Sequence, residues 1–219
     1  MNQIEKIEQQ LLEIEKNLEK LSTGRSITQA CYNLWKERKI LKRNLSLEKG
    51  EETAVPINWE YTWDSGAPMP HIVSNGYRVF LVYYLGKPDP NWDGTYVKVV
   101  NTSSDIEDLI VLVEFTHVVN YKFGGPNDEV IHGHPLYEHG LEAYTAHEII
   151  NSKWLVEQEQ INSVHSCYSS ERWKNLRHLI FTFHDEVFEC ITQGYKVEMF
   201  KGRFREVVFE ATTRLFATQ

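Results

Sequence analysis

The sequence predicts an α+β protein, in which an antiparallel helical hairpin of coiled-coil type precedes a mixed, mainly antiparallel β-sheet domain with two or three helices. Three observations lead to this prediction. Apolar residues recur at alternating intervals of three and four over residues 1–48, the spacing of a coiled-coil seam. Segments rich in aromatic and β-branched residues follow from Tyr77 onward, as in strands. The end of the chain returns to helical spacing, at Val207, Val208, Ala211 and Leu215.

Residues 1–48 divide into two helices. The seam of the first helix consists of Ile4, Ile7, Leu11, Ile14, Leu18 and Leu21. Thr23-Gly24 should end this helix, because glycine suits the left-handed position that follows a helix. Ser26 and Gln29 form a capping-box pattern that opens the second helix. The first helix is rich in glutamate and the second in lysine and arginine, so we expect the two to attract each other as an antiparallel pair.

Two helices of this length bury little apolar surface by themselves. Four apolar positions lie outside the seam and are available to pack against another helix: Leu12, Trp35, Ile40 and Leu47. We therefore expect residues 1–48 to form a homo-oligomer or to bind a protein partner. The basic stretch of the second helix is interpreted as a salt-bridged helix face, with nucleic-acid binding as the alternative.

Residues 49–70 are predicted to be a linker followed by an extended segment. Trp59, Tyr61 and Trp63 alternate there between prolines, which is typical of an extended strand packed on a domain. A ladder for stacking a ligand is the alternative. The domain proper is assigned to residues 71–219. Its expected strands are residues 77–85, 96–100, 109–121, 179–183, 187–192 and 195–200, and its internal helices are residues 151–161 and 170–176.

Composition limits the classes of function. The net charge is −8, which argues against nucleic acid as the main partner and against binding to an anionic membrane. The three cysteines are widely spaced, so we expect neither a disulfide framework nor a cysteine-rich zinc site, and Cys190 is expected to be a buried, inert thiol. No apolar run approaches ~18 residues and no signal peptide is evident, so the expected location is the cytoplasm, without a membrane.

The segment Gly124–Tyr137 is the most unusual part of the sequence. It combines three glycines and two prolines with three consecutive polar residues and two histidines. Functional residues concentrate in loops that a rigid scaffold holds in place. Together with two downstream segments, it supplies five candidate binding residues: Asn127, Asp128, Asn151, Trp154 and Asp185.

The sequence resembles an uncharacterised bacterial family over about residues 120–195. The matching motifs are Gly-x-Pro-Asn-Asp-Glu, Gly-His-Pro-Leu, Asn-Ser-x-Trp, Phe-His-Asp and Phe-Glu-Cys, at residues 124–129, 133–136, 151–154, 183–185 and 188–190. The resemblance implies candidate positions, and it implies no reaction.

Three interpretations of this loop remain open. In the first, a divalent metal is bound by His132, His134, Glu138 and His184, because imidazole and carboxylate are common metal ligands. In the second, acid/base catalysis uses Glu129, His134 and His184. In the third, the residues are structural: Pro126 opens a short helix, the next three residues form its first turn, and the histidines bond to nearby backbone.

No phosphate-binding loop, dinucleotide fingerprint or hydrolase elbow is present in the sequence. The function that we favour is an intracellular oligomeric interaction or ligand-binding protein, with Gly124–Tyr137 as its recognition surface and a small molecule or protein as its partner. The alternative is a small metal-dependent or acid/base hydrolase centred on Glu129, His132, His134 and His184. No cofactor is expected, except the divalent metal that the first interpretation requires.

Overall fold

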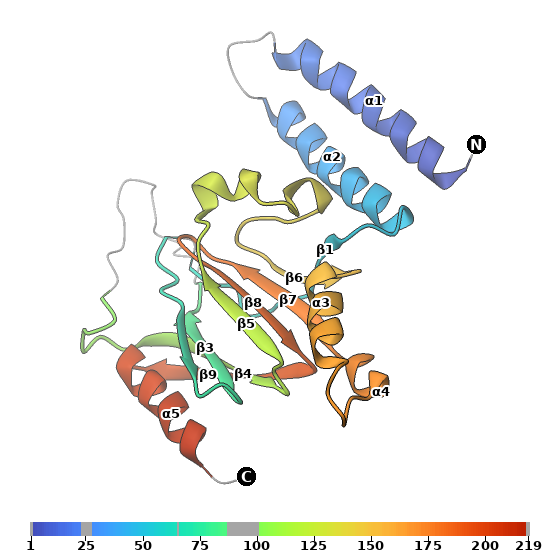
Figure 1. Ribbon diagram of the computed structural model, residues 1–219. Coiled ribbons are helices and arrows are strands. Elements are labelled where there is room, and N and C mark those ends of the chain that lie inside the picture. The colour runs from blue at the N-terminus through green and yellow to red at the C-terminus, as the bar shows by residue number, and fades with distance from the viewer. Residues whose placement is uncertain (1, 23–27, 65, 87–100, 218–219) are drawn as a thin grey trace.

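The computed structural model describes residues 2–22, 28–64, 66–86 and 101–217 (Figure 1). Two N-terminal helices are followed by two antiparallel sheets, and further helices lie outside the sheets. The α+β prediction is therefore confirmed. Within the described part of the chain, no helix has the length and apolar character that are needed to cross a bilayer.

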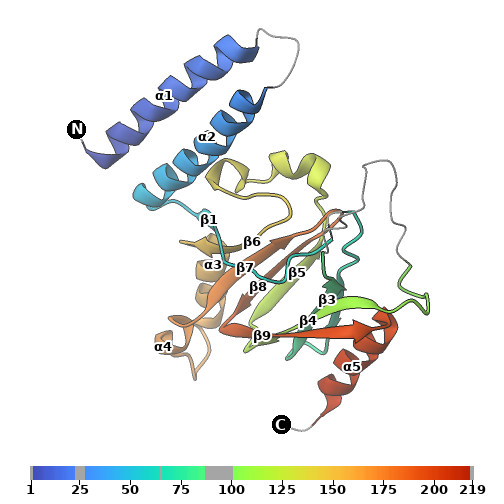
Figure 2. The ribbon, with the colours of Figure 1, turned by 180° about the vertical axis from the view of Figure 1, so that it is seen from behind.

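The first two helices, α1 (Gln3–Ser22) and α2 (Gln29–Glu48), form an antiparallel hairpin that projects from the sheets (Figures 1 and 2). Its seam buries Ile7, Leu11, Ile14 and Cys31. Ion pairs join the helices, with 3.5 Å between Arg38 Nε and Glu15 Oε1 and 2.9 Å between Lys49 Nζ and Glu8 Oε1. The expected attraction between the helices is thus confirmed.

The expected cap of the second helix was wrong. Helix α2 begins at Gln29, and its N-cap is Thr28, whose hydroxyl accepts the N–H of Cys31 at 3.4 Å. Threonine, like serine, is a preferred N-cap residue, because its hydroxyl oxygen accepts a backbone N–H of the first turn. The predicted helix end at Thr23-Gly24, and Ser26 itself, lie outside the described residues.

The first sheet has five antiparallel strands in the order β1-β6-β7-β8-β5. Their bounds are Thr53–Pro56 for β1, Ala146–Ile150 for β6, Arg177–Thr182 for β7, Val187–Thr192 for β8 and Asn120–Gly124 for β5. The predicted hairpin of β7 and β8 is present. Strand β1 comes from the expected linker, and it ends in Pro56 at the sheet edge, where a missing N–H is tolerated.

The second sheet has four antiparallel strands in the order β2-β3-β4-β9. Their bounds are His71–Ser74 for β2, Val79–Tyr84 for β3, Asp108–Thr116 for β4 and Gly194–Gly202 for β9. Every side chain of β3 is buried, because the first sheet covers one face and helix α5 (Phe204–Phe216) covers the other. Helix α5 is the predicted C-terminal helix.

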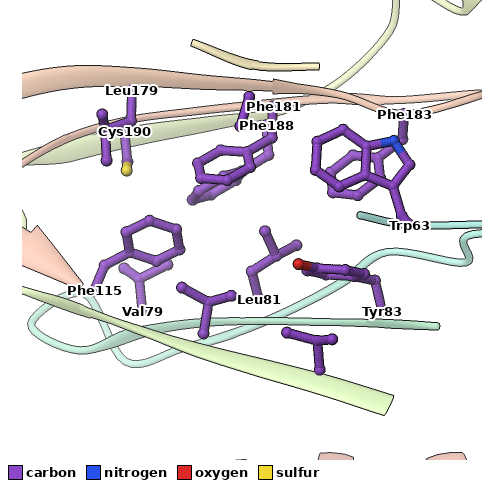
Figure 3. Close-up of a cluster of buried hydrophobic side chains, with 13 residues drawn as sticks. Trp63, Val79, Leu81, Tyr83, Phe115, Leu179, Phe181, Phe183, Phe188 and Cys190 are labelled. Atoms are coloured by element: carbon purple, nitrogen blue, oxygen red, sulfur yellow. The ribbon is translucent and has the colours of Figure 1, made fainter. Parts of the chain in front are cut away.

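Aromatic side chains fill the space between the two sheets (Figure 3). Trp63 packs on Phe183 with ring centroids 4.6 Å apart, and Trp59 packs edge-on against Phe181 at 5.0 Å. The alternating aromatics of residues 59–63 therefore belong to the core. This placement confirms the packing interpretation and leaves no exposed ladder for a ligand.

Two predictions about strands were incomplete. The expected strand over residues 109–121 is two strands in different sheets, because the chain turns at His117, whose φ is +52°. Strand β6 was not predicted, since His147 and Glu148 interrupt its apolar pattern. The expected strand at residues 96–100 lies outside the described residues.

Short helices and one longer helix lie outside the first sheet. Two 3₁₀ helices, η1 (Asp128–Gly133) and η2 (Tyr137–His139), bury Ile131 and Leu136 against it. Helix α3 (Lys153–Asn162) places Trp154 on β7, and α4 (Ser170–Trp173) follows it. The outer face of the first sheet is thus covered by the segments that carry most of the candidate residues.

Candidate functional site

Three polar side chains from separate segments meet at one end of the first sheet. Asp128 begins η1, Tyr144 precedes β6, and His184 lies in the turn between β7 and β8. The backbone N–H of Asp128 donates to the His184 carbonyl at 2.8 Å, which fixes η1 to this turn. Two residues predicted from the sequence, Asp128 and His184, are therefore brought together.

The hydrogen bonds of this cluster determine the tautomer of His184. The Tyr144 hydroxyl donates to Asp128 Oδ2, and His184 Nδ1 lies 2.8 Å from the Tyr144 oxygen and 3.3 Å from Asp128 Oδ2. Because the tyrosine proton is already donated, Nδ1 faces two acceptors and must carry the imidazole proton. In the neutral imidazole Nε2 then holds the free lone pair, and the His184 side chain is 38% exposed.

Negative charge surrounds this histidine. The hydrogen bond from Tyr144, together with the nearby His184, holds the pKa of Asp128 below its usual value. Burial and the bond to Asp128 raise the pKa of Tyr144, so the phenol keeps its proton. Burial, reinforced by Asp185, raises the pKa of Glu186. The site therefore presents one imidazole nitrogen among carboxyl groups.

A second polar cluster lies on the outer face of the first sheet. Ser152 Oγ lies 2.8 Å from His178 Nδ1, and His178 Nε2 lies 2.9 Å from Glu189 Oε2. Ser152 Oγ also accepts the N–H of Leu155 at 3.0 Å as the N-cap of α3. The order serine, histidine, glutamate matches a hydrolytic triad. However, Ser152 is only 5% exposed, which leaves its hydroxyl out of reach of a substrate. The three hydrogen-bonded side chains therefore hold α3 against the sheet.

The remaining members of the second cluster are Lys122 and Trp154. Lys122 Nζ lies 3.6 Å from Glu189 and 3.8 Å from the centroid of the Trp154 ring. Burial lowers the pKa of His134, and the nearby charges that act on it are those of Glu189, Lys122, Glu52 and His178. His134 therefore lies within range of the charges of the second cluster.

The proposed catalytic set Glu129, His134 and His184 is divided by this arrangement. His134 Nδ1 accepts the N–H of Leu136 at 3.1 Å, as the structural interpretation expected, whereas His184 belongs to the first cluster. Glu129 is exposed on η1. The physical reason is that η1 and the following turn run along the sheet, so side chains a few residues apart reach different strands.

The proposed metal ligands are also separated. Glu138 pairs with Lys42 of the hairpin, His184 is bonded to Tyr144, and His132 is exposed on η1. Over the ranges that the structure describes, no three His, Cys, Asp or Glu side chains are grouped as a metal ion would require.

The other predicted binding residues have varied surroundings. Asn127 caps η1 by accepting the N–H of Val130 at 3.3 Å, and the Asn151 amide donates to the Glu51 carbonyl at 3.4 Å. Trp154 is buried. Asp185 is exposed beside His184, with 4.0 Å between its Oδ1 and the histidine Nε2. Of the five, Asp128 and Asp185 lie at the first cluster.

Sequence reasoning missed four residues that define these clusters: Tyr144, Ser152, His178 and Glu189. Tyr144 adopts a left-handed backbone conformation with φ of +55°, which no sequence motif marks. Glu189 occupies an outward position in a predicted strand, and His178 lies on β7 one residue before the predicted bounds of that strand. Side chains alternate between the two faces of a sheet along each strand, and this alternation is the sequence feature that could have identified His178 and Glu189 as neighbours on one face.

Comparisons with known proteins return no relatives. No family model matches the chain, and neither the curated proteins nor the solved structures contain a significant match.

Proposed function

We propose that the protein is a ligand-binding protein whose recognition site is the first cluster together with the Gly124–Tyr137 loop that supplies Asp128. The observation that supports this proposal is the bond pattern around His184. Asp128 and Tyr144 engage Nδ1, so the exposed ring offers Nε2 as an oriented hydrogen-bond acceptor.

The surroundings of His184 indicate which ligands suit the site. Asp128, Asp185 and Glu186 would repel an anion, and Nε2 accepts a hydrogen bond from an N–H or O–H group. We infer that the ligand is neutral or cationic and carries such donors, as guanidinium, amine and sugar groups do.

Nuclear magnetic resonance of the histidine side chains tests this proposal. Methylguanidinium, glucose and acetate are titrated separately while the ring-nitrogen signals of His184 are followed. A saturable shift with methylguanidinium or glucose is expected, and none with acetate. Calorimetric titration with the ligand that shifts His184 should show no binding by His184→Gln, whereas His132→Gln, an exposed change in the same loop, should bind as the wild type does.

Two results would contradict the proposal. One is a His184 signal that stays unchanged with all three compounds at concentrations up to ~0.1 M. That concentration would saturate a site with a Kd near 1 mM, which corresponds to a binding free energy of only about −4 kcal/mol. The other is equal binding by wild type and His184→Gln.

A second candidate function is acid/base hydrolysis. It is favoured by the same tautomer, because an oriented imidazole with a free Nε2 can take a proton from water. Hydrolysis of p-nitrophenyl acetate should then fall about 10-fold or more in both His184→Gln and Asp128→Asn, as expected for loss of a general base. Equal rates in the variants and the wild type would exclude this role.

Self-association through residues 1–48 also remains a proposal. Leu12 and Ile40 support it, since they are 57% and 40% exposed on the hairpin. Deleting residues 1–48 would also remove the bond between Ser46 Oγ and His139 Nδ1, so point variants give a cleaner test. If the hairpin forms an oligomer, Leu12→Gln with Ile40→Gln should lower the mass measured by light scattering. A wild-type mass of one chain would contradict self-association.

A further inference from the structure

A groove of about 580 Å³ lies between α2 and the segment that carries η2. The second half of α2 is fastened to that segment: Ser46 bonds to His139 at 2.8 Å, Lys42 pairs with Glu138, and Arg43 pairs with Glu142. The groove extends from these contacts to the first half of α2, at Tyr32 and Trp35. Figure 1 shows α2 as the helix of the hairpin nearer to the sheets.

Large aromatic side chains stand uncovered in this groove. Tyr32 is 59% exposed and Trp35 is 46% exposed, although both belong to a helix that buries other residues. Across the groove, Lys39 Nζ lies 5.3 Å from the centroid of the Tyr137 ring. Exposed tryptophan and tyrosine beside cationic groups are typical of the residues that dominate binding energy at protein interfaces.

The charge of the groove is opposite to that of the chain. The chain has a net charge of −8, whereas four cationic and two carboxylate side chains line the groove. Among the described residues, Lys36 forms no ion pair, and burial together with the neighbouring Arg38 lowers the pKa of Lys42. An added carboxylate would therefore relieve repulsion between cations.

The side chains that pair with these cations indicate that the groove binds a protein and not a nucleic acid. Lys42 binds Glu138, Lys39 lies 3.9 Å from Glu142, and Arg38 lies 3.5 Å from Glu15, so each already engages a glutamate carboxylate. Glu138 and Glu142 interrupt the row of cations, so the groove lacks the continuous basic surface that a phosphate backbone requires, whereas a single carboxylate can still pair with Lys36.

We propose that this groove is a docking site for an acidic segment of another protein, in which an aliphatic or aromatic side chain is flanked by carboxylates. The apolar side chain packs on Tyr32 and Trp35, and a carboxylate pairs with Lys36. This inference concerns a different surface from the His184 site, and neither depends on the other.

Fluorescence polarisation tests the proposal on the full-length chain. The probe is a fluorescein-labelled peptide with the repeat Glu-Glu-Leu, compared with a Gln-Gln-Leu peptide of equal length and with an oligothymidylate. The acidic peptide should bind most tightly, and its affinity should fall as salt is raised from about 0.05 to about 0.5 M. Trp35→Ala and Lys36→Glu should each weaken binding by about 10-fold, the equivalent of about 1.4 kcal/mol.

Matched controls exclude nonspecific effects. Tyr77→Ala removes an exposed aromatic ring elsewhere, and Lys174→Glu reverses an exposed charge elsewhere, so both should bind the probe as wild type does. Because Trp35 and Lys36 are exposed, circular dichroism should show unchanged helix content in their variants.

Three outcomes would overturn the proposal. The acidic peptide and the Gln-Gln-Leu peptide could bind equally, or the oligothymidylate could bind more tightly than both. Alternatively, light scattering could show that the wild type is a dimer and that Trp35→Ala converts it to a monomer, in which case a second copy occupies the groove. The His184 titrations would be unaffected in every case, so failure here is distinguishable from failure of the ligand-binding proposal.

Discussion

His147 lies on β6 with no exposed surface, and the fold keeps it neutral. Its Nε2 accepts the N–H of Glu142 at 3.2 Å. Burial, assisted by the charges of Arg43 and Lys39 on α2, lowers the pKa of His147 to about 3 from a usual value of 6.5. The unfolded chain therefore binds a proton at this residue at a higher pH than the folded chain does.

The sign of the pH effect follows from this difference. Above pH 6.5 neither state is protonated and stability is unaffected, whereas between pH 6.5 and about pH 3 only the unfolded state gains the proton. Each pH unit in that interval removes about 1.4 kcal/mol from the free energy of unfolding, so His147 should remove about 3 kcal/mol at about pH 4.5.

Urea denaturation of wild type and His147→Gln measures this contribution. Glutamine can accept the same N–H but does not titrate, and the other titrating groups are common to both proteins. The wild type should be the more stable at about pH 7.5, and its advantage should shrink by about 3 kcal/mol at about pH 4.5. An advantage that stays constant within about 0.5 kcal/mol would refute a neutral buried His147.

Three further predictions follow from local geometry. Gly140→Ala should lower the free energy of unfolding by about 1–3 kcal/mol in urea denaturation, because φ is +98° and the new Cβ would lie 2.6 Å from the Ala54 carbonyl oxygen. Glu189→Gln should lower it by a similar amount, about 1–3 kcal/mol, since a buried histidine loses its charged acceptor. Mass spectrometry after iodoacetamide treatment should show the exposed Cys167 labelled first and Cys190, which is fully buried, labelled only on unfolding.

Elements with a local signal were predictable from the sequence. The hairpin and α5 follow from helical periodicity, and β7 and β8 follow from short apolar runs around a polar turn. Strand β6 and the split at His117 were not predictable in this way. Their assignment depends on which sheet each segment joins, and pairing partners distant in sequence determine that choice.

The residues of the candidate site were likewise predictable from the sequence only in part. Asp128 and His184 were selected because both lie in turns, and they do meet. His134 was grouped with them on the same grounds, yet its Nδ1 accepts the N–H of Leu136 and the charges that act on it include those of Glu189 and His178. Loop position alone does not specify the direction of a side chain, which depends here on the outer surface of the first sheet.

Among the described residues, the main contacts of the hairpin with the rest of the molecule come from α2. Helix α1 packs chiefly on α2, whereas α2 contacts both α1 and the segment around η2. Release of α1 would therefore uncover Cys31 and the other seam residues of α2 without disturbing either sheet. In native-state hydrogen exchange, the amides of α1 should open at a lower free energy than those of β3, whose side chains are all buried. The protein thus carries a terminal unit that can fray separately from a rigid two-sheet body.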